Sequence, residues 1–175
     1  MEKTTYAEQV FTDVKDAQIE GALKIFSNEQ RNIMSILYHS DTSQSTKQIR
    51  NIFINHIFYK ITEDLHFKLV GAKPREIPIR IDYLPNKDLW KKLIDNEYNK
   101  APKDIKPYQV FELQNKLLSR AGVKILGFST IQTILENLEQ LGFVIKQPSI
   151  KTKVNYYWTL NPKFFALLKT KGIKL

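Results

Sequence analysis

The sequence predicts a mainly α protein that carries a small β-hairpin near its C-terminus. Apolar residues recur at steps of three and four through most of the chain, as on one face of a helix. Over residues 154–160 the period changes to two, as in a strand with one buried face. The composition is 42% hydrophobic and 26% charged, with little Gly or Pro, which indicates a folded chain of one substantial domain or two small ones.

The N-terminal part of the chain predicts three helices. Residues 5–26 read as an amphipathic helix, and Ser27 is a good N-cap for a second helix with Ile33, Ile36 and Leu37 turned inward. After a polar break at residues 39–45, a continuous apolar stripe runs from Thr46 to Leu65. Two interpretations remain open for this helix pair: an αα-hairpin used for packing or dimerisation, and a first helix-turn-helix.

The segment that follows predicts an exposed or edge strand and then a domain boundary. Gly71 to Pro74 ends the long helix, and residues 76–85 alternate between apolar and polar. Pro78 has no N–H to donate to a sheet, which confines such a strand to an edge. We place the boundary near residues 85–87, which separates an N-terminal helical region at 1–86 from a second domain at 87–175.

The second domain begins with two predicted helices. Residues 88–98 form the first, with Leu89, Trp90, Leu93 and Ile94 expected to pack inward. Pro107 suits the first turn of the next helix, which Ala121-Gly122 closes before a turn at residues 123–128.

A third helix is predicted at residues 130–141, with Ser129 as its N-cap and Gly142 as its stop. A short strand at 143–145, a basic hairpin tip at 146–153 and the alternating strand follow, and a last helix contains residues 164–168. The apolar stripe of the third helix must face the core and consists of Ile131, Ile134, Leu135, Leu138 and Leu141. Its outward residues are then Thr130, Gln132, Thr133, Glu136, Asn137 and Gln140.

The net charge of +9 is concentrated in the last part of the chain. Residues 101–175 hold 12 Lys and Arg against 4 Asp and Glu, and no acidic residue follows Glu139. A one-sided basic segment favours a polyanionic partner, although a Lys-rich solvated surface is the simpler alternative.

Several classes of function are disfavoured. The chain has no cysteine, which excludes disulfides and Cys-ligated zinc, and its three histidines lack a metal-ligand spacing. There is no glycine-rich phosphate loop, nucleophile elbow or clear carboxylate pair, so we expect neither an enzyme nor a small-molecule cofactor. No apolar run reaches the ~20 residues that span a bilayer, and the N-terminus lacks a signal-peptide apolar region. We therefore expect a cytoplasmic, nucleoid-associated protein with no membrane partner.

The order of a serine-led helix, Leu138-Glu139, Leu141-Gly142, an apolar strand, a basic hairpin and an aromatic strand resembles a winged helix-turn-helix. It is similar to such domains in small prokaryotic and archaeal transcription regulators, and the resemblance covers roughly residues 88–170. The implied fold class is mainly α with a small β wing: a winged helix-turn-helix plus an N-terminal helical region. The implied partner is double-stranded DNA, bound as a homodimer.

The residues predicted to contact DNA fall into two groups. Lysines of the turn and the wing neutralise phosphates, whereas amide and hydroxyl side chains of the 130–141 helix contact base edges or phosphate oxygens. The predicted set is Lys124, Ser129, Thr130, Gln132, Thr133, Asn137, Lys146, Lys151, Thr152 and Lys153. Glu136 is the exception, because its carboxylate repels phosphate unless it accepts from a cytosine amine or pairs with a lysine.

Two alternatives to a transcriptional regulator stay open. The unmatched N-terminal region fits a replication initiator or partition protein of a plasmid or virus with two winged helices. The 130–141 helix contains no Lys or Arg. That absence fits a winged helix used for protein–protein interaction.

Overall fold

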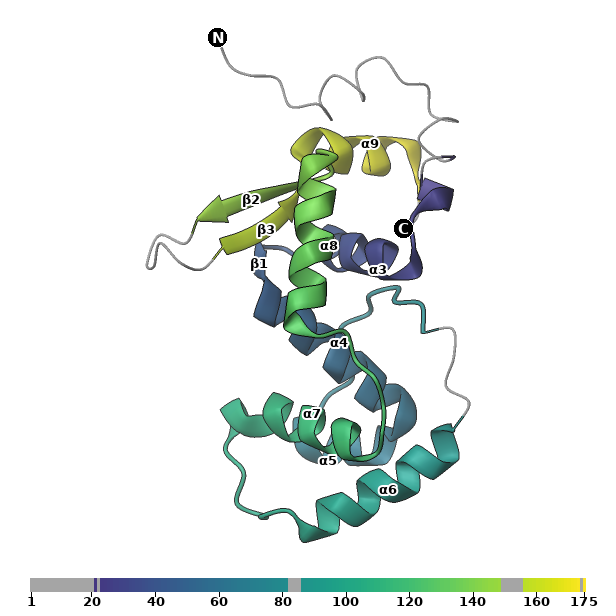
Figure 1. Cartoon of the computed structure of the whole chain (residues 1–175), viewed down its shortest axis with the longest axis vertical. Helices are drawn as coiled ribbons and strands as arrows, with labels where there is room; N and C mark the ends of the chain where they lie inside the picture. Colours follow the sequence, from purple (N-terminus) through teal and green to yellow (C-terminus); the bar gives the residue numbers. More distant parts are fainter. Residues whose placement is uncertain (1–20, 22, 82–85, 149–155, 174) are drawn as a thin grey trace. The chain divides into compact units, whose positions relative to one another are not determined.

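The computed structural model describes residues 21, 23–81, 86–148, 156–173 and 175, and it confirms a mainly α fold with a small antiparallel sheet (Figure 1). The described residues divide into two compact units. The sheet-containing unit takes those in 1–49, 77–80 and 128–175, and the helical unit takes those in 50–76 and 81–127. The sheet-containing unit thus draws residues from both sides of the boundary expected near 85–87.

The sheet-containing unit is built from segments at the two ends of the chain. Its elements in chain order are α3 (Asn28–Tyr38), β1 (Gln44–Ser45), the start of α4 (Thr46–Ile61), α8 (Phe128–Gln140), β2 (Val144–Pro148), β3 (Tyr156–Leu160) and α9 (Pro162–Lys171). The strand order is β1-β3-β2, all antiparallel, with Gln44 opposite Trp158 and Val144 opposite Leu160. A helix that leads into a hairpin, with a short N-terminal strand on the hairpin's far side, is compatible with a winged helix.

Local sequence explains where several of these elements begin and end. The Ser27 hydroxyl accepts from the N–H of Gln30, whose side chain in turn accepts from Ser27 N–H, and this reciprocal pair starts α3. Ser45 and Gln48 make the same two bonds at the start of α4. Gly142 ends α8 with a φ of 83°, a left-handed conformation that favours glycine.

The core of the sheet-containing unit lies between its helices and the sheet. Trp158 is completely buried in β3, and α8 and α9 each turn a stripe of apolar residues inward. Asn161 joins the end of the hairpin to the glycine turn: its side-chain amide donates to the Gly142 carbonyl at 3.1 Å, and its oxygen accepts from Lys163 N–H. The fully buried apolar side chains of α3, α8 and α9 are Ile33, Met34, Ile36, Ile131, Leu135, Leu138, Phe164 and Leu168.

The helical unit contains the remainder of α4, α5 (Glu63–Val70), α6 (Lys87–Lys100), the 3-10 helix η1 (Pro107–Gln109) and α7 (Val110–Arg120). The predicted long helix from Thr46 to Leu65 is interrupted at Thr62, where α4 ends and α5 begins. Apolar side chains from all four helices form one core, and Arg120 is paired with Glu97 at 2.8 Å on its surface. Buried residues of this core include Ile54, Phe58, Ile61, Leu65, Ile94, Leu113, Leu117 and Leu118.

Three sequence expectations need correction. Residues 76–81 are not a strand, although Ile77 and Ile79 are buried as their alternation suggested. Leu89 and Leu93 were expected inside but are 54% and 37% exposed, so α6 buries only Ile94 fully. Leu141 was expected in the inward stripe of α8 and is 43% exposed. The predicted helix at residues 5–26 lies mostly outside the described residues. Within that range, residues 21 and 23–25 are described as helical.

Candidate nucleic-acid interface

Helix α8 presents one polar face to solvent. Ile131, Leu135 and Leu138 are completely buried, and this spacing fixes which side of the helix faces the core. The opposite side carries neutral hydrogen-bonding groups and a single carboxylate. The exposed residues of that side are Ser129, Thr130, Thr133, Glu136, Asn137 and Gln140.

Ser129 has a different role from the predicted one. Helix α8 begins at Phe128, so Ser129 lies inside the first turn and is not the N-cap. Its backbone carbonyl accepts a hydrogen bond from the Thr133 hydroxyl at 3.0 Å. The Thr133 proton is therefore directed along the helix, and its methyl group and oxygen lone pairs are what remain available to a partner.

Gln132 was expected on the outward face, but its side chain is half-buried and both of its polar atoms are engaged. Its Oε1 accepts from the hydroxyl of Thr46 at 2.7 Å, and its Nε2 donates to Oε1 of Glu136 at 3.2 Å. Thr46 is buried at the start of α4. Both polar atoms of Gln132 are thus engaged within the protein, which differs from the free amide expected for a paired bond to an adenine edge.

Lys146 lies on β2, directly opposite Trp158 of β3. Its Nζ is 3.9 Å from the ring centroid of Tyr156 and 5.8 Å from that of Trp158, so the ammonium rests over aromatic faces. Tyr156 is 38% exposed, whereas Trp158 is buried. Strands β2 and β3 thus bring together the Lys146 ammonium and the accessible ring of Tyr156.

The other predicted contact residues do not belong to the described part of the sheet-containing unit. Lys151, Thr152 and Lys153 lie outside the described residues. Lys124 is exposed but belongs to the helical unit.

Sequence reasoning missed Lys47. It is exposed in the first turn of α4, beside the buried Thr46 whose hydroxyl bonds Gln132 of α8. Nothing in the local sequence links residues 44–48 with α8. Their proximity depends on β1 pairing with β3 and on the Thr46–Gln132 hydrogen bond.

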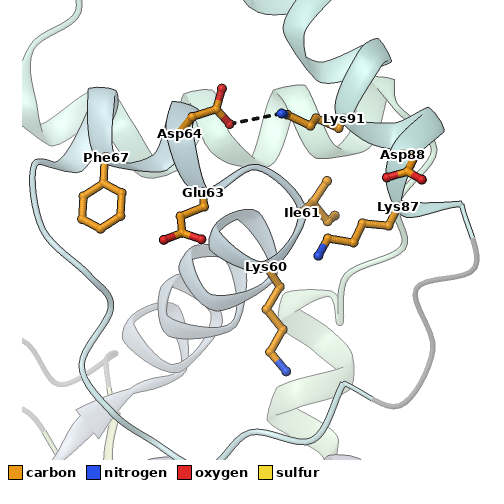
Figure 2. Close-up of a pocket in the computed structure, with 8 residues that line it drawn as sticks. All are labelled: Lys60, Ile61, Glu63, Asp64, Phe67, Lys87, Asp88 and Lys91. Carbon is orange, nitrogen blue, oxygen red and sulfur yellow. Dashed lines mark ion pairs between the residues drawn. The ribbon is translucent and has the colours of Figure 1, made fainter.

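The helical unit contains a cleft of about 660 Å³ between the end of α4, the start of α5 and the start of α6 (Figure 2). Three lysines and three carboxylates line it together with two apolar side chains. The lining residues are Lys60, Ile61, Glu63, Asp64, Phe67, Lys87, Asp88 and Lys91. The opposing charges balance, so the cleft favours neither an anion nor a cation.

Asp64 of this cleft is stabilised in its ionised form by several neighbours. Burial opposes its ionisation, but the Thr62 hydroxyl at 3.1 Å, the Lys91 ammonium at 3.6 Å and two backbone N–H groups outweigh that effect. Its pKa is therefore below the usual value. This carboxylate is ionised at neutral pH and serves as a local partner for Lys91, not as a proton donor.

Two histidines of the helical unit have lowered pKa values. Burial is the main cause for both, and at His56 the nearby Lys60 and His66 add to it. His66 Nε2 lies 2.9 Å from the Ala72 carbonyl, to which it donates as a neutral ring. No group of three or more His, Cys, Asp or Glu side chains in the described part of the chain is arranged to hold a metal ion.

Comparisons with protein-family models, with curated proteins and with solved structures give no match for this chain. Within the described ranges, no helix has the length and apolar character needed to cross a membrane.

Proposed function

We propose that the protein binds double-stranded DNA through the sheet-containing unit, as a winged helix-turn-helix protein of the transcription-regulator type. The observation that carries this proposal is the exposed polar face of α8 next to a β2-β3 hairpin that follows it directly. A helix of this kind, flanked by a hairpin and by the start of another helix, has the shape that fits a major groove.

The charge distribution supports the same proposal. After Glu139 the chain contains lysines but no acidic residue, so the hairpin and α9 are uniformly basic. Lys47 is exposed at the start of α4, which the Thr46–Gln132 hydrogen bond joins to α8, and the N-terminus of a helix favours an anion. Lys47 and Lys146 thus add positive charge to the unit that presents the nearly neutral face of α8.

The mechanism we propose is equilibrium binding without catalysis. Lys47, Lys146, Lys151 and Lys153 neutralise phosphates and supply most of the affinity, and α8 contacts base edges. The ring of Tyr156 holds the ammonium of Lys146 in place, which limits the side-chain entropy that Lys146 loses on binding.

The test measures affinity for a generic labelled duplex over a series of salt concentrations. We expect the Lys146→Ala/Lys151→Ala/Lys153→Ala variant to show a salt slope lower by roughly 2–3 than the wild type. Lys92→Ala, on an exposed position of α6 in the helical unit, is the matched control and should keep the wild-type slope. Absence of wild-type binding at low salt would refute the proposal.

The expected homodimer remains a prediction. Helix α9 is one candidate for the dimer contact, but its Phe164 and Leu168 are completely buried within the sheet-containing unit. Only Phe165 is left partly exposed among its aromatic residues, at 36%. Sedimentation at high micromolar concentration tests the prediction, and a monomer there would exclude a stable homodimer.

A further inference from the structure

Glu136 is the one acidic residue on the exposed face of α8. On a surface that faces DNA, a carboxylate is repelled by the phosphates and lowers the affinity for every sequence. Within the described residues it is paired with no lysine or arginine; its hydrogen-bond partner is the amide of Gln132. The presence of this carboxylate in the middle of the interface therefore needs a different explanation.

A chain of hydrogen bonds fixes the direction of the Glu136 carboxylate. Thr46 is 4% exposed and lies at the start of α4, where the reciprocal bonds between Ser45 and Gln48 hold the backbone. Its hydroxyl is 2.7 Å from Gln132 Oε1, and Gln132 Nε2 is 3.2 Å from Glu136 Oε1.

Only one orientation of the Gln132 amide satisfies both neighbours. Reversing the amide would place its oxygen against the Glu136 carboxylate, where two acceptors repel each other. The carboxylate therefore determines which end of the amide faces it, the hydroxyl of Thr46 holds the other end of the amide in place, and the held amide directs the carboxylate. One oxygen of Glu136 is occupied in this way, and the other has no protein donor among the described residues.

We propose that Glu136 determines sequence specificity by accepting a hydrogen bond from the N4 amino group of a cytosine in the major groove. Cytosine offers a donor there without an adjacent acceptor, whereas adenine places its N7 acceptor beside the N6 amino group. A carboxylate held in one direction therefore prefers cytosine. This inference rests on the proposed DNA binding and deepens it.

In the same proposal, Gln132 and Thr46 are positioning residues that act through Glu136. Gln132 is not a base reader, because both of its polar atoms are already bonded within the protein. Thr46 contributes to specificity although its side chain is buried and cannot reach a base.

A simpler role is a helix-stabilising pair, since Gln132 and Glu136 are four residues apart and such pairs support a helix. The two roles predict different measurements. A purely structural pair affects the melting temperature and leaves the base preference unchanged. A positioning role changes the preference at one base position and is rescued by a variant that keeps the hydroxyl.

The experiment selects bound duplexes from a randomised library at low salt and sequences them. The wild type should enrich cytosine at one position by on the order of tenfold, and Glu136→Gln should reduce that preference to near one while binding generic duplex at least as tightly. Thr46→Val and Gln132→Met should weaken the same preference, and Thr46→Ser should retain it. Glu139→Gln, on the same helix, is the matched control and should keep the wild-type pattern.

The outcomes separate this inference from the proposed function. If the wild type binds no duplex, DNA binding itself fails and the inference fails with it. If the wild type binds in a salt-dependent way but without any base preference, only the inference is overturned. The same holds if Glu136→Gln keeps the wild-type preference. Circular dichroism confirms that each variant is folded.

Discussion

The side chain of Asn32 is bonded to both backbone groups of Arg80. Its Nδ2 donates to the Arg80 carbonyl at 3.0 Å, and its Oδ1 accepts from the Arg80 N–H at 2.8 Å. A buried amide on α3 thus takes the place of a neighbouring strand for the segment at residues 77–80. Ser35, one turn further along α3, donates to the Pro78 carbonyl at 2.9 Å. The two side chains hold this segment within the sheet-containing unit.

Asn32→Ala should lower the free energy of unfolding by about 1–3 kcal/mol, because it removes two hydrogen bonds and leaves backbone groups without a partner. Ser35→Ala removes a single bond and should lower it by about 0.5–1.5 kcal/mol. Chemical denaturation of both variants measures the difference. Equal effects would contradict the strand-like role of Asn32.

The buried stripe of α8 gives a second stability prediction. Leu135 is completely buried, whereas Leu141 is 43% exposed just beyond the end of the helix. Leu135→Ala should lower the free energy of unfolding by about 2–5 kcal/mol, since it removes apolar contacts and leaves a cavity. Leu141→Ala should have an effect of about 1 kcal/mol or less. Denaturant melts of the two variants test the assignment, and similar losses would show that Leu141 also packs in a core.

Much of this fold follows from local patterns in the sequence. Helix α8, the glycine that ends it and the two strands after it were predicted because each depends on residues within a few positions of one another. The short strand β1 was not predicted, because a two-residue strand has no pattern of its own and its partner β3 lies near the other end of the chain.

Two errors show where local patterns are insufficient. The alternation at residues 76–81 correctly places Ile77 and Ile79 inside, but the backbone there bonds to side chains of α3 and not to a strand. Leu89 and Leu93 repeat at a helical spacing, yet no element of the described residues covers them fully. The same limit applies to the candidate site. The spacing of apolar residues in α8 predicts which face is exposed. The hydrogen bond between Gln132 and Thr46 could not be predicted, because Thr46 is far from α8 in the sequence.

Acid should destabilise the helical unit through His66, which is buried, and His56, which is half-buried. The pKa values of His56 and His66 are lowered in the folded protein, so the unfolded chain binds protons more readily. Their contribution to stability is complete above about pH 6.5, the usual histidine value, and is lost as the pH falls from there towards the folded-state pKa. The melting temperature should therefore decrease between about pH 7 and pH 5.5.

The His56→Gln/His66→Gln variant should show a flatter dependence over that interval, because glutamine does not titrate. Each single variant should keep part of the slope. Thermal melts followed by circular dichroism at a series of pH values measure this. A double variant with the slope of the wild type would show that other groups cause the acid sensitivity.

Lys47 provides the sharpest check on the extent of the proposed interface. Its ammonium is exposed at the start of α4, and the Thr46–Gln132 bond ties that helix start to α8. If it neutralises one phosphate, Lys47→Ala should lower the salt slope by about 0.9 and weaken binding to all sequences alike. Glu136→Gln should instead change the base preference without lowering the affinity for generic duplex. Salt titrations of both variants on two unrelated duplexes distinguish these effects, and a sequence-dependent loss in Lys47→Ala would show that this lysine contacts a base and not the backbone.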